Sequence, residues 1–264
     1  MEIYNLDKNK KSSKDSPIPY PPFTAYFCAK KKSGKTVLLV NCLIRKEMLK
    51  DKFHQVYVCS PTSKIDEKWD LVRNQTITIP NKPLINLMKK IHKKKQKLLQ
   101  MPDDDIDTDE SPLPVEFIED IDMKFLSDLM YENKFIIENY GKKFANQILV
   151  IFDDCIKSKI FNSKAFMDLI FKSRHFCLSF IIISQDYFSE PKALRNNNTW
   201  VCLWDSGNKK EIQKMYEENN NGLSWDEFWK VWNYIMDEDY AFLNINYNNS
   251  KKNRLWNSFK ECIS

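Results

Sequence analysis

The chain has 264 residues, 42% of them hydrophobic and 13% aromatic, enough for one large domain or one domain with an insertion. No apolar run approaches the length of a membrane span, and the N-terminal segment lacks the apolar centre of a signal peptide, so we expect a soluble protein. Seven cysteines without a C-x-x-C pair favour a reduced, intracellular protein with no zinc site and no disulfide framework. The net charge of +5 permits a polyanionic partner without requiring one.

The first 22 residues are mostly polar and lysine-rich, and they end in a group of prolines. This composition predicts a flexible basic N-terminal arm, or simply a disordered terminus. We expect the folded domain to occupy residues 23–264.

Residues 23–39 combine an apolar, β-prone run, a polar loop and the start of an apolar helix. Strand, loop, Gly-Lys-Thr and helix is the arrangement of a phosphate-binding loop, in which backbone N–H groups and the helix N-terminus face the phosphates. In such a loop Lys35 neutralises the β- and γ-phosphate oxygens, and the hydroxyl of Thr36 coordinates Mg²⁺. The residues predicted to bind the nucleotide are Lys30, Lys31, Lys32, Ser33, Gly34, Lys35 and Thr36.

This loop departs from the usual pattern G-x-x-x-x-G-K-[ST] at its first position, where the chain has Ala29. An alanine is compatible with the loop if it keeps a negative φ, and Gly34 is retained where the backbone comes closest to phosphate. Alone, the SGKT tetrapeptide is a weak signal, because a helix of any α/β protein can begin this way.

The next segments predict a strand at residues 55–59 and a basic amphipathic helix at 83–101. That helix is rich in lysine outside its apolar face, which suits nucleic-acid contact or simply a solvated surface. An acidic run at 103–110 follows, and we expect it to be a mobile surface loop. We interpret residues 80–140 as an insertion between core strands.

Apolar runs at residues 147–152, 176–184, 200–204 and 240–245 predict further strands. Helices are expected between them, one of them introduced by the capping box of Ser224 and Glu227. Strands that alternate with helices predict an α/β layered fold with a largely parallel sheet.

Polar residues follow two of these buried runs and suggest phosphoryl chemistry. Asp153 closes one run, where its carboxylate can reach the Mg²⁺ held by Thr36, and Asp154 can polarise the attacking water. Gln185 ends the next run, where an amide can sense the γ-phosphate and orient water. The structural alternatives are a capping turn for the aspartates and an ordinary polar strand end for the glutamine.

An arginine could complete such a site from a neighbouring subunit. Arg174 precedes the strand that ends in Gln185, and Arg195 competes with it for this role. Alternatively, Arg174 interacts with the dipole of the preceding helix.

Four stretches together resemble the FtsK–HerA class of P-loop ATPases, specifically the poxvirus-type packaging ATPases of large DNA viruses and their virophages. They are SGKT, QILVIFDDC, SRHFCLSFIIISQ and LRNNNTWVCLWDSGNKKEI, and they lie in order within residues 23–216. The resemblance implies a RecA/ASCE-like three-layer P-loop NTPase fold that uses ATP and Mg²⁺. It also implies a motor that pumps double-stranded DNA into a capsid, as a homo-oligomeric ring with an arginine finger in trans. The implied partners are capsid or portal-vertex proteins, and the implied location is the host cytoplasm and possibly the virion.

Two other functions stay open at this point. A P-loop nucleoside or nucleotide kinase would transfer the phosphoryl group to a small acceptor, although such enzymes usually carry an arginine-rich lid after the core. A non-catalytic nucleotide-binding virion protein is favoured only by Ala29.

Overall fold

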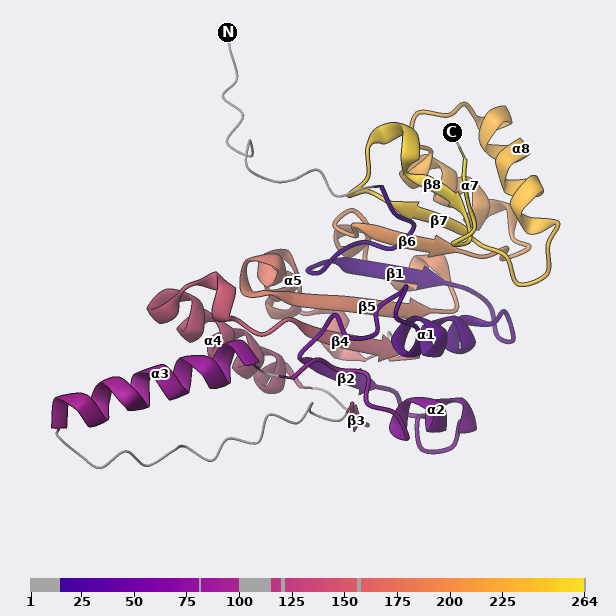
Figure 1. Ribbon diagram of the computed structural model, residues 1–264. Helices are drawn as coiled ribbons and strands as arrows, with labels where there is room; N and C mark the ends of the chain where they lie inside the picture. The colour runs from indigo at the N-terminus through magenta and orange to yellow at the C-terminus, as the bar shows by residue number, and fades with distance from the viewer. Residues whose placement is uncertain (1–14, 81, 100–114, 120–121, 156–157, 264) are drawn as a thin grey trace, which may run out of the picture.

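A nine-stranded sheet, in the order β3-β2-β4-β5-β1-β6-β7-β8-β9, forms the centre of the molecule (Figure 1). This computed structural model describes residues 15–80, 82–99, 115–119, 122–155 and 158–263. The strands are β1 (Thr24–Cys28), β2 (Gln55–Cys59), β3 (Glu116–Ile118), β4 (Ile148–Asp153), β5 (Leu178–Ser184), β6 (Trp200–Leu203), β7 (Leu243–Asn246), β8 (Leu255–Asn257) and β9 (Glu261–Cys262). The α-helices are α1 (Lys35–Ile44), α2 (Asp70–Arg73), α3 (Lys82–Leu99), α4 (Met123–Tyr140), α5 (Lys164–Lys172), α6 (Lys192–Arg195), α7 (Lys209–Asn219) and α8 (Trp225–Met236).

The six strands from β3 to β6 run parallel, and β7, β8 and β9 continue the sheet in antiparallel fashion. In the register of the centre, Cys28 at the end of β1 lies opposite Ser184 of β5 and Leu203 of β6. Because parallel strands end at the same edge, whatever follows β1, β4, β5 and β6 gathers there. The strand β5 lies between β1 and β4, so the segment after β5 is placed between the other two strand ends.

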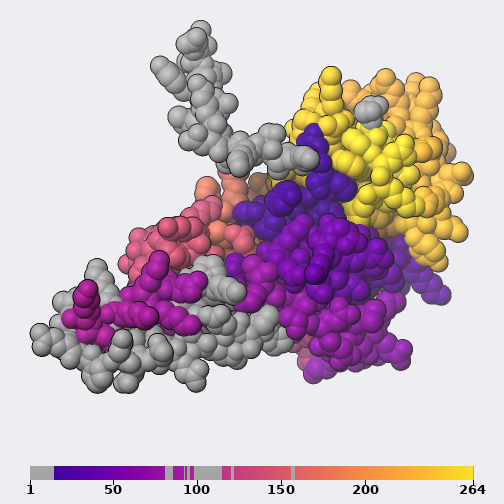
Figure 2. Space-filling view, in the orientation of Figure 1, coloured from indigo at the N-terminus to yellow at the C-terminus, as the bar shows by residue number. Residues whose placement is uncertain are grey.

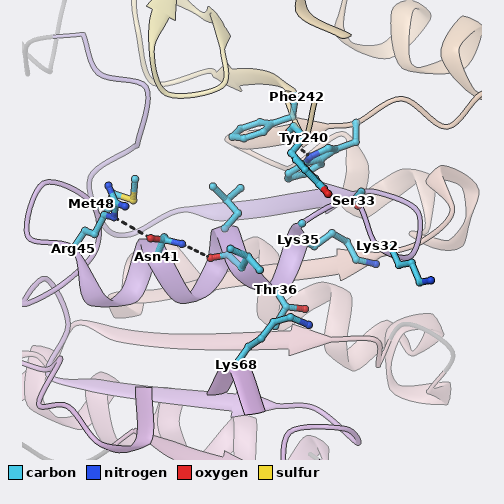
Figure 3. A pocket seen from close by; sticks show the side chains of 14 residues that line it. Lys32, Ser33, Lys35, Thr36, Asn41, Arg45, Met48, Lys68, Tyr240 and Phe242 are labelled. Atoms are coloured by element: carbon cyan, nitrogen blue, oxygen red, sulfur yellow. Dashed lines mark hydrogen bonds between the residues drawn. The ribbon is translucent and has the colours of Figure 1, made fainter. Parts of the chain in front are cut away.

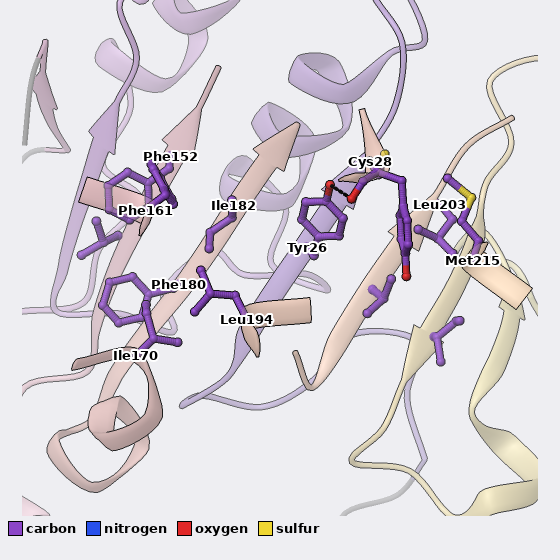
Figure 4. Close-up of a cluster of buried hydrophobic side chains, with 14 of the residues drawn as sticks. Tyr26, Cys28, Phe152, Phe161, Ile170, Phe180, Ile182, Leu194, Leu203 and Met215 are labelled. Carbon is purple, nitrogen blue, oxygen red and sulfur yellow. Dashed lines mark hydrogen bonds between the residues drawn. The ribbon is translucent and has the colours of Figure 1, made fainter. Parts of the chain in front are cut away.

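Two hydrophobic layers cover the sheet, one on each face. Tyr26 and Cys28 point into a cluster shared with α4, α5, α7 and α8 (Figure 4). The alternate residues Ala25 and Phe27 point into the opposite cluster, which α1 and α2 cover. Every residue of β1, β4 and β5 is buried, as expected for strands packed on both faces. The predicted three-layer α/β fold with a largely parallel sheet is confirmed.

The predicted core strands and helices are present, with shifted ends. Phe176 lies in a 3₁₀ turn, Ser173–Phe176, before β5 begins. The last predicted strand begins only at Leu243, because Tyr240 adopts a left-handed backbone with φ of 64° that no strand accommodates. The short strands β3, β8 and β9 were not predicted, since two or three residues carry no periodic pattern.

Residues 80–140, interpreted as an insertion, contribute to the central layers. The basic helix is confirmed as α3, β3 extends the sheet beside β2, and α4 buries Leu126 and Leu129 in the core. The acidic run at 103–110 lies outside the described residues. That this stretch is an insertion stays a prediction.

Part of the expected N-terminal arm is attached to the sheet. Ile18 is buried, the carbonyl of Pro17 accepts a hydrogen bond from Asn244 of β7, and that of Ser16 accepts one from Asn246. Asparagine side chains of β7 therefore bind the backbone of this segment, and a flexible arm over residues 1–22 stays a prediction. Residues 1–14 lie outside the described part of the chain. Across the described ranges, no helix has the length and apolar character needed to cross a membrane.

Candidate active site

The loop between β1 and α1 is shaped by two left-handed residues. Lys32 has a φ of 65° and Gly34 a φ of 89°, and α1 begins immediately afterwards at Lys35. Gly34 suits this geometry because glycine has no Cβ to strain. The first N–H groups of α1 have no partner within the helix, so they can bind an anion.

Ala29 adopts no positive φ and continues the path of β1. Its N–H donates to the carbonyl of Ser184 at 3.0 Å, and its side chain is buried. The condition under which alanine can replace the first glycine of the loop is therefore met.

Lys35 and Asp153 are both nearly buried, with 8% and 5% of their surfaces exposed. Burial lowers the pKa of Lys35, while Asp154 and Asp153 oppose that shift. Burial and the neighbouring Asp154 raise the pKa of Asp153 to about 6, although Lys35 acts in the other direction. At neutral pH the site thus holds a desolvated ammonium group beside a desolvated carboxylate, each stabilised in its charged form by the other.

No described residue donates a hydrogen bond to the Asp153 carboxylate, so its oxygens are available to water or to a metal ion. Mg²⁺ commonly takes one or two protein oxygen ligands and keeps several waters. Asp153 at the end of β4 and Thr36 in the first turn of α1 therefore fit a magnesium ion. Among the described residues, no group of three or more His, Cys, Asp or Glu side chains could hold a metal.

Asp154 and Gln185 contact each other directly. The Nε2 of Gln185 donates to the Oδ1 of Asp154 at 2.8 Å, across the ends of the neighbouring strands β4 and β5. Asp154 has a φ of 56°, which turns the chain away after β4 and leaves its carboxylate exposed. The structure thus brings together two residues that were singled out separately in the sequence.

A cavity of about 710 Å³ opens beside the loop and runs along α1 (Figure 3). Lys32, Ser33, Gly34, Lys35 and Thr36 line it, but Lys30 and Lys31 do not. The ammonium group of Lys30 instead lies over Gly207, 3.4 Å from where a Cβ would stand. Any contribution of these two lysines through their backbone stays a prediction.

Besides residues of α1 and the turn after it, four residues from other segments that the sequence did not indicate also line this cavity: Lys68, Trp204, Tyr240 and Phe242. They come from the 3₁₀ turn after β2 and from the segments after β6 and before β7. From the sequence alone, the lysine is expected to be a charged surface residue and the three aromatic residues are expected to be ordinary core residues. One signal could have indicated Trp204, because it ends an apolar run, residues 200–204, that was predicted to be a strand.

The two candidate arginines lie at the other end of the strands. Arg174 is exposed in the turn before β5, and about 20 Å of strand separates it from the edge that carries Gln185. Arg195 is instead bound within its own subunit, where its Nε and Nη2 contact the carboxylate of Glu218 at 2.8 and 3.1 Å. Its guanidinium also lies over the ring of Tyr187. The ion pair is nearly buried, so Arg195 is committed to the fold.

Comparison with known proteins places this geometry among viral proteins. Residues 115–240 match the family model described as poxvirus A32 protein. Uncharacterized protein 075L of Invertebrate iridescent virus 6 is 28% identical over 142 residues, which are 53% of this chain and 52% of that protein. The chain therefore spans about half the length of this relative.

Solved structures of the genome packaging NTPase B204 from Sulfolobus turreted icosahedral virus 2 share the fold. The complex with ATP-gammaS has a TM-score of 0.51 at 12% identity, covering 90% of this chain and 98% of that one. The complex with AMP has a TM-score of 0.50 at 13% identity, covering 87% and 95%. The family-model match bears out the resemblance to a poxvirus family that was drawn from the sequence, and the solved structures show the shared fold.

Proposed function

We propose that this chain is an ATP hydrolase that drives double-stranded DNA into a viral capsid. The observation that carries the proposal is the contact between Asp154 and Gln185 at the strand edge that also holds Lys35 and Asp153. The family match and the fold shared with a genome packaging NTPase support it.

Each residue of the site has a task in this reaction. The α1 N-terminus and Lys35 bind the phosphates, and burial strengthens the attraction between the ammonium group and the phosphate oxygens. Thr36 and Asp153 would hold Mg²⁺, which would supply positive charge to the phosphates. Asp154 accepts a proton from the attacking water or orients it, and Gln185 holds the Asp154 carboxylate while its amide oxygen remains available to that water.

The arginine that completes the site comes from a neighbouring subunit on this proposal. Arg174 is exposed, and no described residue binds its guanidinium. Its distance from its own nucleotide loop supports a role in trans, which requires a homo-oligomer such as a ring. The remaining partners are then capsid or portal-vertex proteins, met in the host cytoplasm.

A surface for DNA is supplied by α3. This helix carries seven lysines and no acidic residue, more positive charge than the net +5 of the whole chain. Lys90, Lys93 and Lys97 are exposed, and α3 forms an extremity of the molecule, remote from the orange and yellow C-terminal part (Figure 2). Such a helix can neutralise backbone phosphates without reading the sequence, as a packaging motor requires.

Hydrolysis measured with and without double-stranded DNA tests this function. We expect the wild type to release free phosphate faster with DNA, and Lys35→Ala to lose hydrolysis because the phosphate charge loses its ammonium partner. Replacing Lys90, Lys93 and Lys97 by alanine should remove the stimulation and weaken its salt dependence while basal hydrolysis persists. The matched control replaces Lys209, Lys210 and Lys252, which are exposed elsewhere.

Three results would contradict the proposal. Hydrolysis by Lys35→Ala within a few-fold of wild type excludes the phosphate-loop assignment. A phosphorylated nucleoside in place of free phosphate identifies a kinase. An equal loss of stimulation in both lysine triples excludes α3 as the specific DNA surface.

A further inference from the structure

If the proposed function holds, on which this inference rests, the site determines on which side of β1 the γ-phosphate and the base of the bound nucleotide lie. The groups that act on the γ-phosphate, Asp153, Asp154 and Gln185, follow β4 and β5, on one side of β1. The loop after β1 binds the middle of the triphosphate. The base must therefore extend to the opposite side of β1, where β6 and β7 lie.

Aromatic side chains line the cavity on that side. Trp204 directly follows β6, and Tyr240 and Phe242 precede β7. The rings of Trp204 and Phe242 lie 4.5 Å apart at 30°, while Phe242 is buried in the core. Figure 3 shows Tyr240 and Phe242 on one wall of the cavity, above α1, with Lys35 and Lys32 near the N-terminus of that helix. The aromatic wall therefore adjoins the phosphate loop directly.

Tyr240 has two properties that packing does not explain. It is among the most exposed large hydrophobic residues of the described chain, at 72%, and its ring pairs with no other aromatic ring there. Its φ of 64° is unfavourable for a bulky residue, and such strain concentrates at ligand sites. The indole N–H of Trp204 donates to the carbonyl of Tyr240 at 3.2 Å and helps to hold this backbone.

The ring of Tyr240 lies against the phosphate loop itself. Its Cδ1 is 3.5 Å from the position that a Cβ on Gly34 would occupy. An exposed aromatic face therefore stands beside the glycine where the loop turns into α1. A base attached to phosphates in that loop would meet this face first.

We propose that the cavity between α1 and the segments flanking β6 and β7 is the nucleotide-base site, and that Tyr240 stacks on the base. Trp204 and Phe242 form the apolar floor that excludes water from it. The ligand class is a nucleoside di- or triphosphate.

Two polar side chains farther along α1 bond to each other and to the helix backbone. The Oδ1 of Asn41 accepts from the Nε of Arg45 at 2.9 Å, and its Nδ2 donates to the carbonyl of Val37 at 2.8 Å. Both bonds are exposed to solvent, so they do not form a buried set of groups that reads the edge of a base. Because stacking tolerates any base, this site selects weakly between adenine and guanine.

Binding of ADP and of inorganic tripolyphosphate, measured by calorimetry, separates the base from the phosphates. Tyr240→Gly removes the ring and also accepts the left-handed backbone, so it is the appropriate truncation. We expect it to weaken ADP about tenfold, the effect of losing one stacked aromatic, and to leave tripolyphosphate unchanged. Tyr240→Phe should retain most of the affinity, and GDP should bind the wild type within a few-fold of ADP.

The matched control is Tyr20→Gly, at an exposed tyrosine outside the cavity (61% against 72% for Tyr240), which should leave both affinities unchanged. If Tyr240→Gly binds ADP as the wild type does, the base site is elsewhere and this inference is wrong. Equal loss of ADP and tripolyphosphate would make Tyr240 a support for the loop and also overturn it. A wild type that binds neither ligand contradicts the proposed function instead.

Discussion

Two buried charges, Arg195 and Asp153, lie at opposite ends of the parallel strands and differ in their partners. At the amino ends, Arg195 has a bidentate partner in Glu218, whose carboxylate also accepts from the hydroxyl of Tyr187. At the carboxyl ends, Asp153 is as deeply buried and receives no hydrogen bond from a described residue, and its pKa is raised. The fold provides a charged partner for Arg195 and no hydrogen bond to the Asp153 carboxylate. The contrast holds for these two residues, since the buried Glu190 near Arg195 also keeps one carboxylate oxygen without a partner among the described residues.

The same contrast separates the two arginines. Arg195 is buried in its ion pair, whereas Arg174 is exposed nearby with its guanidinium unbound among the described residues. A charge that the fold already uses stabilises the subunit. A charge left at the surface is available to a second subunit. Four measurements test this difference between the two ends of the sheet.

The largest effect is expected at Arg174. Subunits with Arg174→Ala should still bind ATP but lose about three to five decades of hydrolysis rate, as when an arginine finger is removed. Mixing them with Lys35→Ala subunits should restore activity at interfaces where an intact Arg174 meets an intact Lys35. If mixed oligomers form and activity never returns, Arg174 does not act in trans.

Replacing Arg195 should instead lower the stability of the folded protein. Arg195→Ala leaves the nearly buried Glu218 with only Lys214, whose Nζ lies 3.6 Å from its carboxylate, and we expect the free energy of unfolding to fall by about 3 kcal/mol. Arg174→Ala, at an exposed position, should change it by no more than about 0.5 kcal/mol. Denaturant titrations of the two variants test this directly, and similar losses would erase the distinction between the arginines.

Asp154→Asn tests the water-orienting group at the other end of the strands. Asparagine can keep the bond from Gln185 and tolerates the left-handed backbone, so the fold and ATP binding should persist. Hydrolysis should slow by about a hundredfold, because the lost carboxylate acts mainly in the transition state. A parallel loss of ATP affinity, measured by calorimetry, would instead make Asp154 a structural or metal-binding residue.

The smallest effect concerns the metal-free protein and Asp153. Its pKa of about 6 exceeds the ordinary value of 3.8, so the folded state binds this proton more tightly than the unfolded state. The contribution of Asp153 to stability is therefore greatest below pH 4, declines as pH rises toward 6, and is lowest above it. Asp153→Asn should raise the free energy of unfolding at pH 8 by about 2 kcal/mol and should flatten this pH dependence.

Denaturant titrations in the presence of a chelator, at pH 4 and pH 8, provide that measurement. Hydrolysis by Asp153→Asn should be lost even though the protein is more stable. A variant that is destabilised at pH 8 would show that the carboxylate is already satisfied within the fold.

Local patterns in the sequence determined most of the parallel sheet and the residues at its carboxyl edge. Continuous apolar runs gave β4 and β5 because strands buried on both faces need them, and each run ends in a polar residue where the chain leaves the core. Because the carboxyl ends of parallel strands lie at the same edge of a sheet, Lys35, Asp153 and Gln185 could be assigned to one edge from the sequence alone. The individual roles of these residues stay predictions.

Which residues from distant segments come into contact depends on the tertiary structure. Tyr240 beside Gly34, Trp204 on the cavity wall, the ion pair of Arg195 and the docking of residues 15–22 on β7 all join segments far apart in the chain. Periodicity reports which face of an element is buried, but it carries no information about which other element covers that face. Which segment covers a given face depends on how the layers pack. The exposure of Tyr240 and the burial of Arg195 therefore could not be inferred from the residues next to them in the sequence.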